Sequence, residues 1–188
     1  LLDLVVFGRA AGIHIEESLK QGIELQSAGK DDIDLAVSRL NKLNSSKAGE
    51  KVEILKKKMQ DNMQQNFGVF RREDLMLQGI RELEKSRDLV YEVFLGDKSA
   101  LFNTARIEAL ELQNLFEVAE ATAITANERK ESRGAHARDD FPKRDDEKFM
   151  QHTLSWCNGK ETKIDYRPVH KSTLTSDVQY FPPQERVY

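Results

Sequence analysis

Charged side chains and a histidine gather in one short stretch, Glu131 to Asp140, which reads Glu-Ser-Arg-Gly-Ala-His-Ala-Arg-Asp-Asp. Its arginines could hold carboxylates or carbonyl groups through two parallel hydrogen bonds, and its histidine could donate a ring proton. Gly134 can adopt the positive φ that ends a helix, so we expect the last long helix to stop here. The stretch is either a solvated helix end with local ion pairs or a polar joint that packs against another domain.

Arg133 and His136 are the two candidates for such a joint. Arg133 directly precedes the glycine, so a rigid element fixes its position, and its planar guanidinium could clamp carbonyl groups or a carboxylate. His136 could donate one ring proton to the same joint, in a structural role and not in proton transfer. The alternative is that both side chains are exposed and pair locally with Asp139 or Asp140.

The rest of the chain offers little chemistry. None of the four histidines has a second histidine at metal-ligand spacing, so we expect no metal site. The single cysteine, Cys157, excludes an internal disulfide. No Gly-x-Gly-x-x-Gly phosphate turn occurs, and adjacent acids such as Asp145 and Asp146 are poorly placed for general acid–base catalysis. We therefore expect no catalytic residue in this chain.

The stretch around Arg133 also carries a family resemblance. Glu131 to Arg138, followed by Asp-Phe-Pro and then Arg144-Asp-Asp-Glu, resembles the C-terminal region of succinate dehydrogenase and fumarate reductase flavoprotein subunits. The start of the chain, Leu-Leu-Asp-Leu-Val-Val-Phe-Gly-Arg-Ala-Ala-Gly, is similar to the helix that closes the flavin-binding domain of that family. Tyr166-Arg-Pro-Val, Phe181-Pro-Pro and the final Tyr188 resemble its C-terminus. The matches keep the order of the family and cover nearly the whole chain.

The resemblance implies a FAD-dependent succinate:quinone oxidoreductase, which interconverts succinate and fumarate and passes electrons to an iron–sulfur subunit. Membrane-anchor subunits would be indirect partners, at the cytoplasmic face of a bacterial inner membrane or the matrix face of a mitochondrion. In the family, the histidine that holds FAD covalently, the dinucleotide-binding glycines and the proton-delivering arginine lie upstream. We interpret the chain, which starts inside a helical pattern without Met, as a C-terminal fragment or processed piece of a larger protein. We expect the isolated chain to bind no FAD and to be inactive.

Leu1 is the one cofactor-binding candidate that the resemblance supplies. It matches the second residue of a Ser-Leu pair in the family, at a helix N-terminus that points at the pyrimidine end of the flavin ring. Free amides and the positive end of a helix dipole suit the electron-rich carbonyl on that side. The serine of the pair, and the substrate-binding arginine before it in the family, have no counterpart in this sequence.

Two other hypotheses stay open at this point. The chain could be a non-catalytic helical module that binds a partner, or a fragment of an L-aspartate oxidase, which shares the Glu-Ser-Arg-Gly-x-His core. The long tail after Asp146 favours the succinate/fumarate branch. A formal net charge of −3 without a basic cluster argues against a nucleic-acid partner. Asp3 and Arg9 interrupt the apolar run at the start, so this run is not a membrane span.

The elements that must position these residues are mainly helical. Apolar residues recur at helical spacing in the segments 1–19, 33–43, 52–67, 75–95 and 103–127. Asp31 or Asp32 is expected to cap the second helix, and Met59 and Met63 are expected to fill the core. Short loops favour an antiparallel bundle, and the alanines of the last segment imply close contact with neighbouring helices.

After Pro142 the apolar period changes from that of a helix to that of a strand. Asn158-Gly159 predicts a two-residue hairpin turn, Pro168 is expected to end the second strand, and residues 171–188 are expected to be extended. The predicted fold is mainly α, an antiparallel helical bundle followed by a small β-hairpin and an extended C-terminal tail. We expect residues 1–24 to be the last helix of the flavin-binding domain, 25–141 the bundle, and 142–188 the hairpin and tail.

Overall fold

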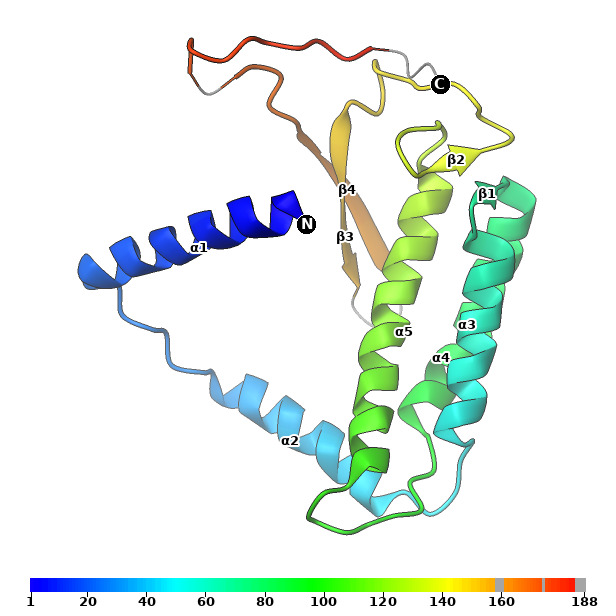
Figure 1. Cartoon of the computed structure of the whole chain (residues 1–188). Helices are drawn as coiled ribbons and strands as arrows, with labels where there is room; N and C mark the ends of the chain where they lie inside the picture. Colours follow the sequence, from blue (N-terminus) through cyan, green and yellow to red (C-terminus); the bar gives the residue numbers. More distant parts are fainter. Residues whose placement is uncertain (158–160, 174, 185–188) are drawn as a thin grey trace. The chain divides into compact units, whose positions relative to one another are not determined.

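A computed structural model describes residues 1–157, 161–173 and 175–184. The chain divides into two compact units, Leu1–Asn41 and Lys42–Tyr188. Five helices and two small sheets make the fold mainly α in the described residues, as the sequence predicts (Figure 1). The domain boundaries expected from the sequence remain a prediction. No helix within the described residues combines the length and the apolarity that crossing a membrane requires.

The first unit contains α1, Leu2–Lys20, and most of α2, Lys30–Ser45. The helical period of the first segment is confirmed, but no residue of α1 is buried. Asp31 and Asp32 lie inside the first turn of α2 and do not cap it, so that prediction is wrong. Their carboxylates still suit this position, because the first turn of a helix carries a positive partial charge.

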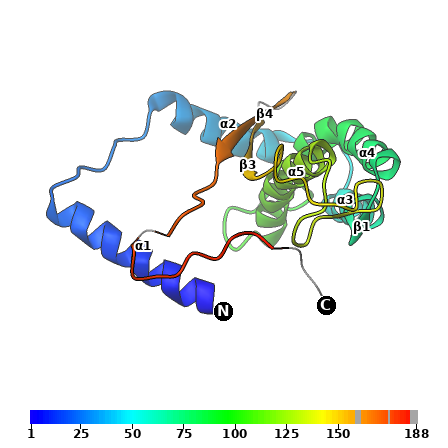
Figure 2. The same cartoon turned by 90° about the horizontal axis from the view of Figure 1, so that it is seen from above.

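The second unit is built around three helices: α3, Val52–Phe67; α4, Glu73–Tyr91; and α5, Thr104–Glu128. Figures 1 and 2 show them side by side, with successive helices running in opposite directions. Their apolar faces meet in one core, and each large side chain buried there contributes roughly 1.5–3 kcal/mol. Its members include Leu55, Met76, Leu83, Leu112 and Phe116.

α5 is the central helix of the bundle. Asn103 caps it, with a side-chain oxygen that accepts a hydrogen bond from the backbone N–H of Arg106 at 2.8 Å. Its buried face is rich in alanine, including Ala109 and Ala123, which are fully buried. Small side chains let α3 and α4 approach closely, as the sequence predicts. Met59 is buried in the same core, and Met63 packs against it.

α4 ends at Tyr91, four residues before the predicted end at Leu95. The apolar positions that follow belong to an extended segment: Val93 and Leu95 are buried, while Phe94 between them is partly exposed. The N–H of Phe94 donates to the carbonyl of Glu50 at 3.0 Å. Alternating burial therefore replaces the helical period at this point, which the sequence alone did not reveal.

A predicted hairpin and an unpredicted pairing complete the unit. β3, Gln151–Cys157, pairs antiparallel with β4, Thr162–Pro168, and β3 lies against α5. Pro168 is the last residue of β4, as predicted, whereas the predicted turn at Asn158-Gly159 and Tyr188 lie outside the described residues. β1, Phe70–Arg71, pairs in parallel with β2, Ala137–Arg138, and so brings the start of α4 to the stretch that follows α5.

Candidate functional site

The site begins where α5 stops. α5 ends at Glu128, with Arg129 as its C-cap, so Gly134 does not end the helix as expected. Gly134 does have the positive φ, 57°, but in a two-residue turn closed by main-chain hydrogen bonds between Arg133 and His136, of 2.8 and 3.0 Å. Glycine adopts this conformation without steric cost, so the turn fixes the two joint candidates next to each other.

Glu131 is the buried centre of this site, although sequence reasoning did not single it out. Its side chain has no exposed surface. Its carboxylate accepts from Arg133 Nε at 2.8 Å and Nη2 at 3.0 Å, from Arg129 Nη1, and from the N–H of Asp145 at 2.8 Å. Burial alone would raise the pKa of Glu131, but these hydrogen bonds hold the pKa below its ordinary value. Glu131 is therefore a carboxylate that organises two arginines.

Arg133 lies between two carboxylates of this chain. Besides Glu131, its Nη2 donates to Asp146 at 2.6 Å, and hydrogen bonding to Glu131 raises the pKa of Arg133. Asp146 in turn pairs with Arg144 at 2.8 Å. Arg133 therefore does pair locally, which was the alternative that the sequence left open. Its partners are Glu131 and Asp146, and not Asp139 or Asp140.

His136 is held on both ring nitrogens. Nδ1 lies 2.8 Å from Arg71 Nη1, and Nε2 lies 3.0 Å from the carbonyl oxygen of Arg129. A guanidinium can only donate and a carbonyl can only accept, so Nε2 carries the proton and the ring is neutral. Burial, followed by the charges of Arg71, Arg138 and Arg129, lowers the pKa of His136. A ring locked in this way bridges β1 to the end of α5 and is unsuited to proton transfer near neutral pH.

Arg138 is a second buried charge that sequence reasoning did not single out. It is 1% exposed, stacks on the ring of Phe141 at 4.9 Å, and pairs through two prongs with Asp140. The remaining guanidinium nitrogen, Nη1, donates to the carbonyl of Asn127 at 3.1 Å, in the last turn of α5. The ion pair holds the pKa of Asp140 at about 2, below its ordinary 3.8.

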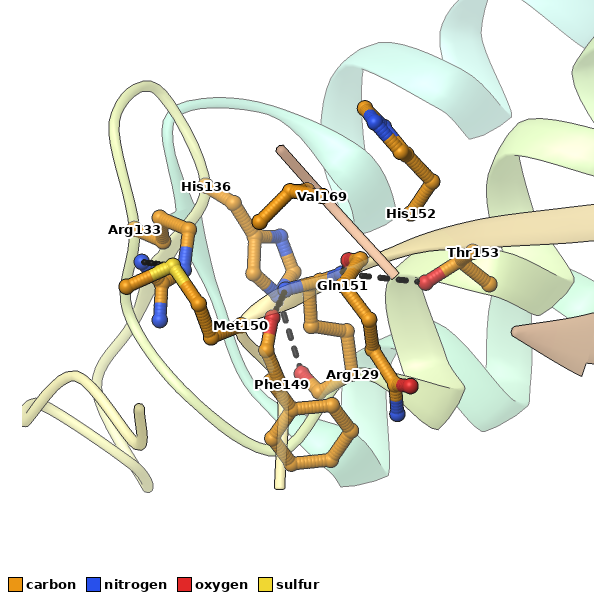
Figure 3. Close-up of a pocket in the computed structure, with 9 residues that line it drawn as sticks. All are labelled: Arg129, Arg133, His136, Phe149, Met150, Gln151, His152, Thr153 and Val169. Carbon is orange, nitrogen blue, oxygen red and sulfur yellow. Dashed lines mark hydrogen bonds between the residues drawn. The ribbon is translucent and has the colours of Figure 1, made fainter. Parts of the chain in front are cut away.

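Arg133 and His136 both line one open cleft of about 490 Å³ (Figure 3). The cleft is formed by the loop after α5, the start of β3 and the residue after β4; the other lining residues are Arg129, Phe149, Met150, Gln151, His152, Thr153 and Val169. Arg129, labelled among the lining residues in Figure 3, donates through Nη1 to the carbonyl of Phe149 at 2.9 Å and through Nη2 to that of Gln151 at 2.6 Å. The charged groups of the wall are therefore already engaged.

The residues that the sequence predicts for the site are distributed over both units of the chain. Within the described ranges no group of three or more His, Cys, Asp or Glu side chains could hold a metal ion. The structure brings Arg133 and His136 together, whereas Leu1 belongs to the other unit, as the N-cap of α1. No side chain caps that helix, so the amide groups of its first turn stay available to a polar group.

Comparison with known proteins gives one consistent family. Residues 56–188 match the family model described as fumarate reductase flavoprotein C-term. A succinate dehydrogenase flavoprotein subunit of Coxiella burnetii is 46% identical over 99% of this chain and 31% of its own length. The mitochondrial succinate dehydrogenase [ubiquinone] flavoprotein subunit of Oryza sativa is 39% identical over 100% of this chain and 30% of its own length.

Solved structures agree with the sequence relatives. A quinol-fumarate reductase with menaquinol molecules superposes with a TM-score of 0.81 at 32% identity, covering 92% of this chain and 30% of the other. A mutant of E. coli quinol fumarate reductase gives a TM-score of 0.78 at 31% identity, covering 94% of this chain and 31% of the other. This chain therefore spans less than a third of the length of these relatives, and it belongs to the succinate dehydrogenase and fumarate reductase flavoprotein family, whose C-terminal part it matches.

Proposed function

We propose that this chain is the C-terminal segment of a FAD-dependent succinate:quinone oxidoreductase flavoprotein and is inactive when isolated. The observation that carries the proposal is the pattern of coverage. Succinate dehydrogenase flavoprotein subunits match essentially all of this chain, while the chain spans about 31% of the length of one of them. The succinate-binding and FAD-linking residues would then lie in the preceding part of the polypeptide, including the histidine that carries FAD.

The exposed surface of α1 supports a role inside a larger domain. Leu4, Val5 and Phe7 are about 70% exposed (72%, 68% and 68%), although apolar side chains of this size are usually buried. Covering them with the flavin-binding part of the protein would contribute roughly 1.5–3 kcal/mol each. In that setting α1 is the last helix of the flavin-binding domain.

Leu1 and the first turn of α1 fit one edge of the FAD ring system. The uncapped amide groups and the positive end of the helix dipole suit an electron-rich carbonyl group. FAD, when bound, supplies the acceptor for the hydride removed from succinate. The residues of this chain would orient the ring and stabilise negative charge at its pyrimidine edge, without touching the substrate.

We also propose that Arg133 and His136 form the joint between the helical unit and the flavin-binding part. Their side chains are held from within the chain, by Glu131 and Arg71 among others, so the cleft they line is already formed before any partner docks. A preorganised surface loses little conformational entropy on docking.

The further partners follow from the family. We expect an iron–sulfur subunit to receive the electrons, and membrane-anchor subunits to be contacted indirectly. The protein would be peripheral on the cytoplasmic face of a bacterial inner membrane, or on the matrix face in a mitochondrion. The relatives include succinate dehydrogenases and a fumarate reductase, so the proposal covers both directions of the reaction between succinate and fumarate.

Purification of the complete protein beside the 188-residue chain tests the proposal. The complete protein should show flavin absorbance and reduce a dye in the presence of succinate, and the isolated chain should do neither. A complete protein without succinate-dependent dye reduction would overturn the assigned activity. Flavin retained by the isolated chain would overturn the placement of the FAD site.

A further inference from the structure

Met150 differs from the other methionines of the chain in its surroundings. Met76 is fully buried in the helical core and Met59 is 8% exposed, whereas Met63 is half-buried at the edge of the core. Met150, just before β3, is only half-buried and lines the open cleft (Figure 3). A small solute can therefore reach Met150 without any opening of the bundle.

The sulfur of Met150 faces a cation. Arg133 Nη1 donates to Met150 Sδ at 3.7 Å, while Nε and Nη2 of the same guanidinium bind the carboxylates of Glu131 and Asp146. A thioether sulfur is a weak acceptor. One prong of a charged, rigidly held donor is thus aimed at a group that accepts it poorly.

We propose that Met150 is a site of methionine oxidation by peroxides, and that Arg133 holds the oxygen atom of the sulfoxide. The sulfur lone pair bonds to one oxygen of hydrogen peroxide, the O–O bond breaks, and the other oxygen leaves as water with both protons. The sulfur is oxidised by two electrons and the peroxide is reduced by two. The sulfoxide oxygen is a strong acceptor for the N–H that already points at this sulfur.

The same reaction in the core has a different outcome. A sulfoxide at Met76, which is fully buried in the core, would place a polar oxygen among apolar side chains, which is unfavourable. At Met150 the oxygen meets a guanidinium and the open cleft. Oxidation at this position is therefore both faster and better tolerated than at the buried methionines.

Limited treatment of the 188-residue chain, in which the cleft is uncovered, with hydrogen peroxide and subsequent peptide mass spectrometry test the reactivity. Met150 should convert at least about tenfold faster than the fully buried Met76, because Met76 reacts only after local opening of the bundle. Equal rates at Met150 and Met76, or slower conversion of Met150, would overturn the proposal. The readout is independent of FAD and of succinate turnover, so it stands apart from the proposed function.

The role of Arg133 is tested by melting the oxidised and unoxidised proteins. Wild type should lose no more than about 2 °C on oxidation of Met150, which for a domain of this size is below 1 kcal/mol. Arg133→Lys keeps the charge but lacks the planar fork, so its melting temperature should fall further on oxidation. Met150→Leu should not respond to the same dose. An equal fall in wild type and Arg133→Lys would remove Arg133 from the proposal.

Discussion

Arg138 and Asp140 form a two-pronged ion pair, with Nε–Oδ1 and Nη2–Oδ2 distances of 2.7 and 2.8 Å, that joins the ends of two antiparallel helices. Arg138 binds the carbonyl of Asn127 in the last turn of α5, and Asp140 accepts from the N–H of Glu73 at the start of α4 at 2.8 Å. A cation lies at the negative helix end and an anion at the positive one, so the dipoles of both helices favour the pair.

Asp140→Asn should remove a pH-dependent part of the stability. The folded pKa of Asp140, about 2, lies below its ordinary 3.8, so its contribution is full above pH 3.8 and is lost as pH falls towards 2. Because Asp140 is exposed and solvent screens its charge, the lowered pKa corresponds to about 1 kcal/mol of stability. Urea titrations of the chain at pH 6 and pH 3 should show a smaller difference between the two pH values in the variant than in wild type.

Asp139→Asn is the matched control for this change, because the neighbouring Asp139 is also exposed but the ion pair of Arg138 is made by Asp140. Its difference in unfolding free energy between pH 6 and pH 3 should equal that of wild type. If Asp140→Asn keeps the full wild-type difference, the Arg138–Asp140 pair is not the source of the acid sensitivity.

Glu131→Gln should destabilise the chain at neutral pH. The substitution leaves Arg129 and Arg133 facing each other across a neutral amide with no exposed surface. Removing one partner of a buried pair costs about 3–5 kcal/mol, and we expect the lower end because Arg129 keeps its carbonyl acceptors and Arg133 keeps Asp146. Chemical unfolding measures the loss, and Glu147→Gln, at an exposed carboxylate, should cost less than about 0.5 kcal/mol. Similar losses in the two variants would contradict the central role of Glu131.

The elements predicted from the sequence are those long enough to repeat an apolar spacing several times. The elements not predicted are short strands that pair with a segment far away in the sequence. α5 and the hairpin follow from repeated spacing, which is local information. β1 and β2 have two residues each, which is too few to show a period. They pair with each other although they are far apart in the sequence. Without that pairing, His136 could not be placed beside Arg71, and its neutral, locked state could not be inferred.

Burial of charge was the other feature beyond the reach of the sequence. Arg133 and His136 are joint candidates because they flank Gly134, directly before it and two residues after it. The structure places both side chains on one cleft. Glu131 and Arg138 belong to a stretch that could equally be a solvated helix end, because charged side chains are rarely fully buried unless they are paired. Whether their partners are close enough depends on the turn at Gly134 and on the loop that brings Asp145 back to Glu131.

Gly79→Ala should destabilise the bundle through steric overlap. A Cβ at Gly79 would lie 2.4 Å from Cε2 of the buried Phe67 and 2.8 Å from Cβ of Asn66, so α3 and α4 would have to separate. Overpacking of this kind costs about 1–3 kcal/mol, more than the gain in helix propensity of about 1 kcal/mol. Thermal melting should show a lower midpoint. Gly96→Ala meets Phe94 at an ordinary 3.6 Å and serves as the control; equal midpoints for the two variants would show that the helices can adjust.

Substitution of Arg133 tests the proposed joint, and the test compares the isolated chain with the complete protein. In the isolated chain, Arg133→Ala and Arg133→Lys should each lose about 1.5–3 kcal/mol, because a charged hydrogen bond to Glu131 is lost or weakened. In the complete protein, both should in addition lose flavin content and succinate-dependent dye reduction, because the cleft that docks the flavin-binding part is deformed. Lysine keeps the charge but not the planar fork, so it should not rescue either property.

Arg144→Lys provides the comparison that separates a joint from general stability. Arg144 binds the same Asp146 at 2.8 Å but does not line the cleft. Replacement of Arg144 should therefore weaken the ion pairs around Asp146, while flavin content and turnover stay at wild-type values. If the Arg133 variants of the complete protein also keep wild-type flavin content, melting temperature and turnover, Arg133 serves only the local ion pairs and the joint must lie on another surface of the helical unit.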